Sequence, residues 1–174
     1  MIYAFDGREP CISKKSYVSE QAIVLGNVKI EDECYVGPGA ILRADYGRIE
    51  IGVGTAVEEG VLIHVYPEDT CRIGTRVTFG HGAIVHASHI GDLAVIGMGA
   101  VVSIGTTIGE RTIVAEGSVV RMKQVIQPGV VAAGNPARVV RKLTPKDEKT
   151  WGAGKQHYVD LVRKYLDLGI HRIG

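Results

Sequence analysis

Three of the six histidines in the chain fall between positions 64 and 86, a spacing that suggests a shared metal ion. Neutral imidazole is a common ligand of zinc and of other transition metals in proteins. His64, His81 and His86 can act together only if the fold brings their side chains to one place. The elements that position them must therefore be derived first.

Aliphatic side chains, with one phenylalanine, recur every six residues along most of the chain, and we call these residues the anchors. Three changes of phase interrupt the pattern. A helix of period 3.6 cannot keep an apolar face at period six, and an ordinary sheet sandwich does not produce one either. The anchors are Ile12, Val18, Val24, Ile30, Val36, Leu42, Ile51, Val57, Ile63, Ile73, Phe79, Val85, Ile90, Ile96, Val102, Ile108, Val114, Val120 and Ile126.

Glycine is unusually frequent, with 23 among 174 residues, about twice the average share. Several glycines directly follow an anchor, as Gly37, Gly52 and Gly97 do, and we expect them to serve tight turns. Each six-residue unit is predicted to be a short strand plus a turn. Three units would close one coil, and coils would stack as parallel strands about 4.8 Å apart.

These features predict a mainly β protein, a parallel β-helix of hexapeptide repeats with a C-terminal α-helix. The repeat resembles the left-handed hexapeptide family. The left-handed sense follows from that resemblance, since ordinary crossover connections are right-handed. We expect the β-helix, with an N-terminal lead-in strand, over 1–143 and a helical tail packed on it over 144–174.

The tail carries its own helix signals. Thr144 can cap a helix that Pro145 begins. Gly152 and Gly154 weaken its first part, so the stronger helix is expected from Gln156 to Leu168. Its apolar stripe, expected to pack on a coil face, is Tyr158, Leu161, Val162, Tyr165 and Leu166.

The coil frame places the histidines. His64 and His86 each follow an anchor, and three units separate them, so they should stack on adjacent coils close enough to share a metal. His81 lies two residues past its anchor, at another corner. A neighbouring copy in a trimer could supply it and leave a fourth metal position open for water. The alternative is that these histidines are surface residues whose stacking is a coincidence.

Bulk composition excludes several classes of protein. The formal net charge of +1 gives no field for nucleic acid or an acidic membrane. The first residues do not form a signal peptide, and no apolar run is long enough to cross a membrane. Three widely spaced cysteines suggest free thiols in a reducing cytoplasm. We therefore expect a cytoplasmic protein without nucleic-acid or membrane partners.

The chain resembles the gamma-class carbonic anhydrases and their relatives over nearly its whole length. The segments that carry the resemblance are Leu42–Asp45, Ile51–Gly52, Gly60–His64, Val77–His86, Ile90–Asp92, Ile96–Ala100 and Gly134–Arg138. The resemblance implies a homotrimer and assigns His64, His81 and His86 as metal ligands.

The same resemblance suggests catalytic roles. Arg43 and Asp45 match a pair that joins two subunits near the site, where it would act in catalysis or only stabilise the trimer. Glu58 stands where the family has glutamine and could accept a proton. Glu59 could orient a ligand histidine. Tyr158 matches a tyrosine brought from the C-terminal helix, although core packing explains it equally well.

The resemblance implies hydration of carbon dioxide to bicarbonate by a metal-bound hydroxide at the subunit interface, a lyase reaction. Zinc is the expected metal, and iron or cobalt would suit imidazole as well. Tyr46 replaces a catalytic glutamate of the archaeal prototype, and its acidic loop is missing, so this activity is expected to be weak. The alternatives are a hexapeptide-repeat acyltransferase or acyl-CoA thioesterase, with acyl-CoA as the substrate, and a non-catalytic scaffold subunit.

Overall fold

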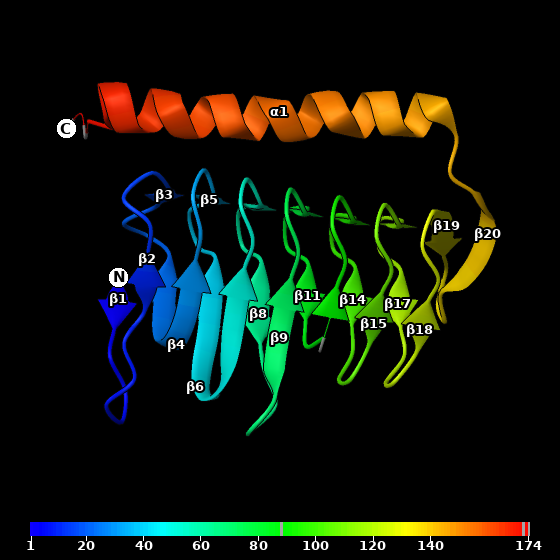
Figure 1. Cartoon of the computed structure of the whole chain (residues 1–174), viewed down its shortest axis with the longest axis horizontal. Coiled ribbons are helices and arrows are strands. Elements are labelled where there is room, and N and C mark those ends of the chain that lie inside the picture. The colour runs from blue at the N-terminus through cyan, green and yellow to red at the C-terminus, as the bar shows by residue number, and fades with distance from the viewer. Residues whose placement is uncertain (88, 172, 174) are drawn as a thin grey trace.

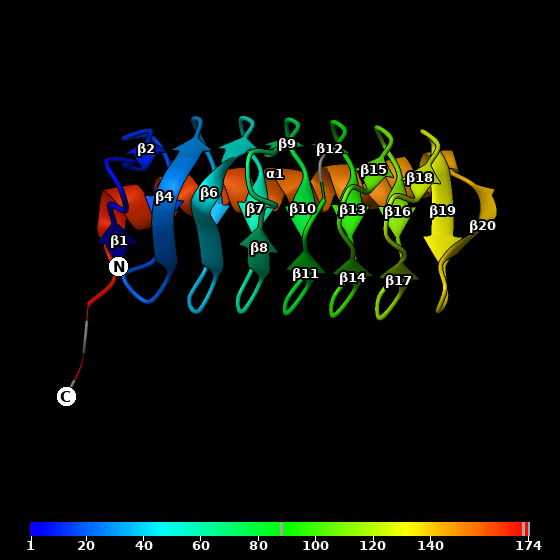
Figure 2. The same cartoon turned by 90° about the horizontal axis from the view of Figure 1, so that it is seen from below.

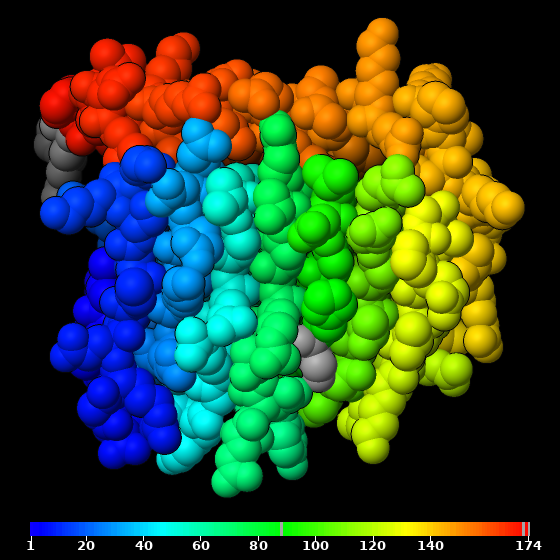
Figure 3. Space-filling view, in the orientation of Figure 1, coloured from blue at the N-terminus to red at the C-terminus, as the bar shows by residue number. Residues whose placement is uncertain are grey.

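The computed structural model describes residues 1–87, 89–171 and 173, so residues 172 and 174 of the expected tail lie outside the described residues. It confirms a left-handed parallel β-helix with one long α-helix along its side (Figure 1). Successive coils lie side by side from the N-terminal to the C-terminal end (Figure 3).

Each coil contributes to three flat faces, and the long strands β4 and β6 bend around a corner to serve two of them (Figure 2). Face 1 consists of β1 (Ile2–Tyr3), the first parts of β4 (Ile23–Ile30) and β6 (Ile41–Ile51), β8 (Leu62–His64), β11 (Ile84–Val85), β14 (Val101–Val102) and β17 (Val119–Val120). Face 2 consists of β2 (Cys11–Ile12), the last parts of β4 and β6, β9 (Thr70–Ile73), β12 (His89–Ile90), β15 (Thr107–Ile108) and β18 (Val125–Ile126).

Face 3 has seven parallel strands and one antiparallel strand at its end. The parallel strands are β3 (Tyr17–Val18), β5 (Tyr35–Val36), β7 (Ala56–Val57), β10 (Thr78–Phe79), β13 (Val95–Ile96), β16 (Ile113–Val114) and β19 (Val130–Ala133). The antiparallel strand is β20 (Arg138–Lys142).

The anchors form the core. Every anchor from Val24 to Ile126 is buried, and Ile12 and Val18 of the first coil are partly buried. The small residues four positions after an anchor are buried too, including Thr112, whose hydroxyl donates to a backbone carbonyl. The six-residue period therefore describes the inside of the coil, as predicted.

The glycines that follow anchors have a different role from the predicted one. Gly52 and Gly97 do not have positive φ angles. A methyl group on Gly97 would lie 2.5 Å from the Glu116 amide nitrogen, and one on Gly52 would lie 2.6 Å from the Gly74 carbonyl oxygen. These glycines are required because the next coil passes too close for a side chain.

The left-handed turn conformation lies three residues after an anchor, and glycine does not always occupy it. Gly60 and Gly82 adopt positive φ, but Glu33, Arg76 and Leu93 do so as well, at the corner between faces 2 and 3. A non-glycine residue there stores about 1–2 kcal/mol of backbone strain. This corner lies along one edge of the helix, and its side chains bond to the helix, as Arg76 does to Gln156.

Helix α1 (Pro145–Leu168) runs back along face 3 from the last coil to the first (Figure 1). Thr144 and Asp147 form a capping box at its start, as the cap prediction implied. The helix passes through Gly152 and Gly154 without a break, which corrects the prediction of a weak first part. Tertiary packing of Lys155, Val159 and Val162 outweighs the glycine penalty of about 1 kcal/mol per residue. None of the described helices is long and apolar enough to span a membrane.

The helix face in contact with face 3 differs from the predicted stripe at three positions. Tyr158, Leu161, Val162 and Tyr165 pack on Tyr17, Tyr35 and Ala56 as expected. Leu166 is exposed instead, whereas Val159 and Lys155 are buried. The contact surface of the helix therefore extends towards Lys155 and Val159 and excludes Leu166.

Substitution of alanine at two glycines should have opposite effects. Gly97→Ala should lower the free energy of unfolding by about 1–3 kcal/mol, because the methyl group collides with the next coil. Gly152→Ala has open space in the helix and should raise it by about 1 kcal/mol. Urea unfolding of both variants measures the difference, and a Gly97→Ala protein as stable as the wild type would contradict it.

Lys155→Met should change how stability depends on pH. Burial and repulsion by Arg76 lower the pKa of Lys155 from 10.5 to about 7, against an opposing attraction from Glu58. Between these values the unfolded chain binds more protons, so the wild-type free energy of unfolding should rise with pH by up to about 1.4 kcal/mol per unit. Urea unfolding from about pH 6.5 to about 9.5 should show this rise in the wild type but not in the variant. Equal slopes would contradict the assignment.

Candidate functional site

His64 ends β8, and His86 directly follows β11, the neighbouring strand of face 1. Ile63 pairs in register with Val85, so the two histidines that follow them stand next to each other. Their ring centroids are 4.7 Å apart, with an angle of 47° between the ring planes. The fold therefore places this pair as the coil frame predicts.

The His86 ring is oriented with one nitrogen free. The Val65 carbonyl accepts a hydrogen bond from the ring, while Nε2 is buried and has no hydrogen-bond partner among the described residues. Burial and the neighbouring His64 lower the pKa of His86 and favour the neutral form. A neutral ring that donates through one nitrogen presents a lone pair on the other, which is how a metal-ligating histidine is held. The residues present thus fit a metal ion.

Asp45 lies between His64 and Arg43. Its carboxylate is 3.4 Å from His64 Nε2 and 3.2 Å from Arg43 Nε, so Arg43 and Asp45 pair within the chain, and the pair between subunits that the resemblance implied stays a prediction. Burial raises the pKa of Asp45, but a backbone hydrogen bond, Arg43 and His64 outweigh burial and lower it. Arg8, from the N-terminal segment, donates to the Asp45 carbonyl and was missed by the sequence analysis.

His81 lies at the turn after β10, at a different corner from the stacked pair. Its side chain is 50% exposed and sits between two carboxylates, with Nδ1 2.6 Å from Glu59 and Nε2 3.2 Å from Glu58. Val57 and Phe79 pair in register, which explains why Glu59 reaches His81 as predicted. Among the described residues, no three metal-binding side chains gather within one chain.

Two tyrosines hold the carboxylates that contact His81. The Tyr35 hydroxyl donates to Glu59 at 2.6 Å, and the Tyr158 hydroxyl hydrogen-bonds to Glu58. Burial raises the pKa of Glu58 and also of both tyrosines. Tyr158 thus both packs in the helix contact and reaches the site. Tyr35 was missed, although its outward position on β5, stacked on Tyr17, could have indicated it.

Face 1 carries an uninterrupted apolar column on its outer surface, next to the stacked histidines. Its members pair in register across six coils and are Ile23, Ile41, Leu62, Ile84, Val101 and Val119. Ile84 is 48% exposed, and the other members are partly buried. The equivalent column of face 2 contains the charged residues Lys29, Glu50 and Arg72. Face 1 is therefore the face suited to contact another protein surface.

Comparison with known proteins gives the same architecture. No family model matches the sequence. The carnitine operon protein CaiE of Citrobacter koseri is 38% identical over 91% of this chain and 81% of that protein. A Bacillus cereus structure provisionally described as an acetyltransferase has a TM-score of 0.92 at 28% identity, over 96% of this chain and 97% of that chain.

A third relative was solved with a ligand. It is a hexapeptide-repeat acetyltransferase of Vibrio cholerae in complex with acetyl-coenzyme A, with a TM-score of 0.53 and 25% identity, over 64% of this chain and 68% of that chain. The fold and the six-residue repeat define the present chain as a hexapeptide-repeat protein. Within that class it belongs to the family of the carnitine operon protein CaiE. Carbonic anhydrase activity and a zinc ion stay predictions.

Proposed function

We propose that the protein is a metal-dependent enzyme that acts on the thioester carbonyl of an acyl-coenzyme A, at sites shared between the copies of a homotrimer. The observation that carries the proposal is the stacked His64–His86 pair, whose buried Nε2 atom on His86 has no partner among the described residues. The choice of acyl-coenzyme A is supported by the structural relative solved with acetyl-coenzyme A.

The positions of the donors support the proposed trimer. His64 and His86 border the apolar column of face 1, and His81 is exposed at another corner. Contact of face 1 with a neighbouring copy would cover that column and could bring a second copy's His81 to the pair. Glu59 lies 2.6 Å from Nδ1 of His81, so a metal would bind at Nε2 and replace the 3.2 Å contact of that nitrogen with Glu58.

A zinc, iron or cobalt ion bound by three histidines would supply a Lewis acid and an activated water. Side chains of the protein would orient the ligand histidines and accept a proton. Arg43 and Asp45 hold His64, while Tyr35 and Glu59 hold His81. Glu58 is the buried carboxylate beside His81 and is the proposed proton acceptor. In the net reaction, thioester and water give a carboxylic acid and free coenzyme A.

Hydration of carbon dioxide is the second candidate function. A three-histidine donor set that leaves one metal position open favours it, because the same activated water suits both reactions. The two candidates differ in substrate and share their residues.

Metal content should depend on histidines from two chains. Wild-type protein purified without air should carry metal, whereas His81→Ala and His86→Ala should each lose it, as measured by mass spectrometry of the metals. Trimers assembled from both variants should recover roughly a quarter of the wild-type content, because some sites then combine intact donors. His89→Ala removes an exposed histidine of face 2 and is the matched control. Full occupancy in His81→Ala would overturn the shared site.

Thioester hydrolysis and carbon dioxide hydration should be assayed in parallel on the same metal-loaded protein. We expect release of free coenzyme A from acetyl- and butyryl-coenzyme A, and a loss of kcat of about 100-fold or more in Glu58→Gln. His89→Ala should keep the wild-type rate. Carbon dioxide hydration without thioester hydrolysis would favour the second candidate. Acyl transfer that requires an added amine or alcohol would indicate an acyltransferase, and metal-free, inactive protein would indicate a scaffold.

A further inference from the structure

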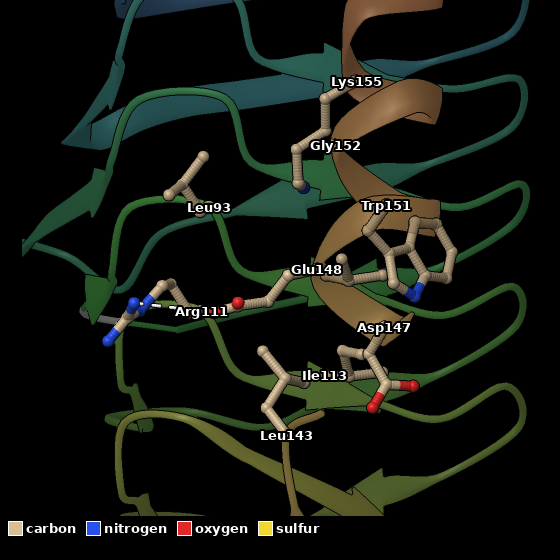
Figure 4. Close-up of a pocket in the computed structure, with 10 residues that line it drawn as sticks. Leu93, Arg111, Ile113, Leu143, Asp147, Glu148, Trp151, Gly152 and Lys155 are labelled. Carbon is tan, nitrogen blue, oxygen red and sulfur yellow. Dashed lines mark hydrogen bonds and ion pairs between the residues drawn. The ribbon is translucent and has the colours of Figure 1, made fainter. Parts of the chain in front are cut away.

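Helix α1 leaves a cavity beneath its first half. The cavity has a volume of about 270 Å³ and lies between the helix and face 3 (Figure 4). Its volume corresponds to about nine water molecules, which suits a small organic molecule. Apolar side chains make up most of its wall, namely Leu93, Val95, Ile113, Leu143 and Trp151. The site residues described above do not line it.

Lys155 brings one amine to this apolar cavity. Its side chain is only 4% exposed and runs from the helix towards the sheet, with its amine ending between Leu93 and Trp151 in Figure 4. The amine donates to the Thr78 hydroxyl and to the Ala94 carbonyl, each at 3.0 Å. An ammonium group has three N–H donors, so one remains for a further acceptor.

The carboxylates around the cavity already have partners. Glu148 pairs with Arg111 at 3.5 Å, and Asp147 binds both Arg141 and Thr144. No ion pair joins Lys155 to a carboxylate within the described parts of the chain. Glu58 attracts this amine without forming an ion pair with it, and burial together with Arg76 still lowers the pKa of Lys155 to about 7. A buried cation that lacks a directly paired anion is unfavourable.

We propose that this cavity binds a small carboxylic acid with an apolar body, whose carboxylate pairs with the Lys155 amine. The apolar wall would hold the hydrocarbon part, and the remaining N–H of Lys155 would donate to the carboxylate. The ligand's carboxylate would serve as the counter-ion of Lys155 through a charge-assisted hydrogen bond. An uncharged ligand would leave the Lys155 ammonium without a paired anion. This site is separate from the histidine site and does not depend on a metal.

The test compares benzoate and hexanoate with benzamide and hexanol by calorimetry on the full chain. We expect the carboxylates to bind at least tenfold more tightly than their neutral counterparts. Lys155→Met should remove this preference, while Lys149→Met, which removes an exposed lysine of the same helix outside the cavity lining, should change the affinity less than twofold. Equal affinities for charged and neutral probes, or no binding of any probe, would overturn the proposal.

A second variant covers the case in which Lys155→Met fails to fold. Ile113→Phe keeps the amine and narrows the cavity, so it should weaken the carboxylates and their neutral counterparts alike. In wild-type protein, bound benzoate should also protect Lys155 from methylation by formaldehyde and borohydride, as measured by peptide mass spectrometry. Unchanged carboxylate binding in Ile113→Phe, or no protection of Lys155, would show that the ligand binds elsewhere and would overturn the proposal.

Discussion

The close stacking of one coil on the next is the constraint on which the rest of the structure depends. Backbone hydrogen bonds between parallel strands set this distance, and every other feature must fit within it. It leaves no room for a side chain at Gly52 or Gly97. It also places His64 directly beside His86, so that two residues far apart in sequence become neighbours without any special loop.

Helix α1 connects the outside of the β-helix with the candidate site. Tyr158 reaches Glu58 from the helix, and Tyr35 reaches Glu59 from face 3, so both carboxylates that contact His81 depend on the contact between helix and sheet. The helix on face 3 therefore stabilises the surroundings of a predicted ligand at the corner that face 3 shares with face 1.

The sequence was sufficient to predict the features of the fold that follow from the six-residue period. It predicted the buried anchors, the three-sided coil and the adjacency of His64 and His86, because each depends only on counting along a regular backbone. It could not predict the burial of Lys155, since a charged side chain beside a glycine is typical of a solvated helix surface. The exposure of Leu166 depends on how the helix is rotated on face 3, which only the packed rings determine.

The strained corner between faces 2 and 3 attaches the C-terminal helix to the β-helix. Glycine would relieve the backbone there, yet Glu33, Arg76 and Arg111 keep side chains that bond Arg163, Gln156 and Glu148 of the helix. A β-helix with glycine at these positions would have less backbone strain, but it would lack the side chains that bond to the C-terminal helix. In this chain, the non-glycine residues at the left-handed turns of this corner therefore fasten helix α1 along it.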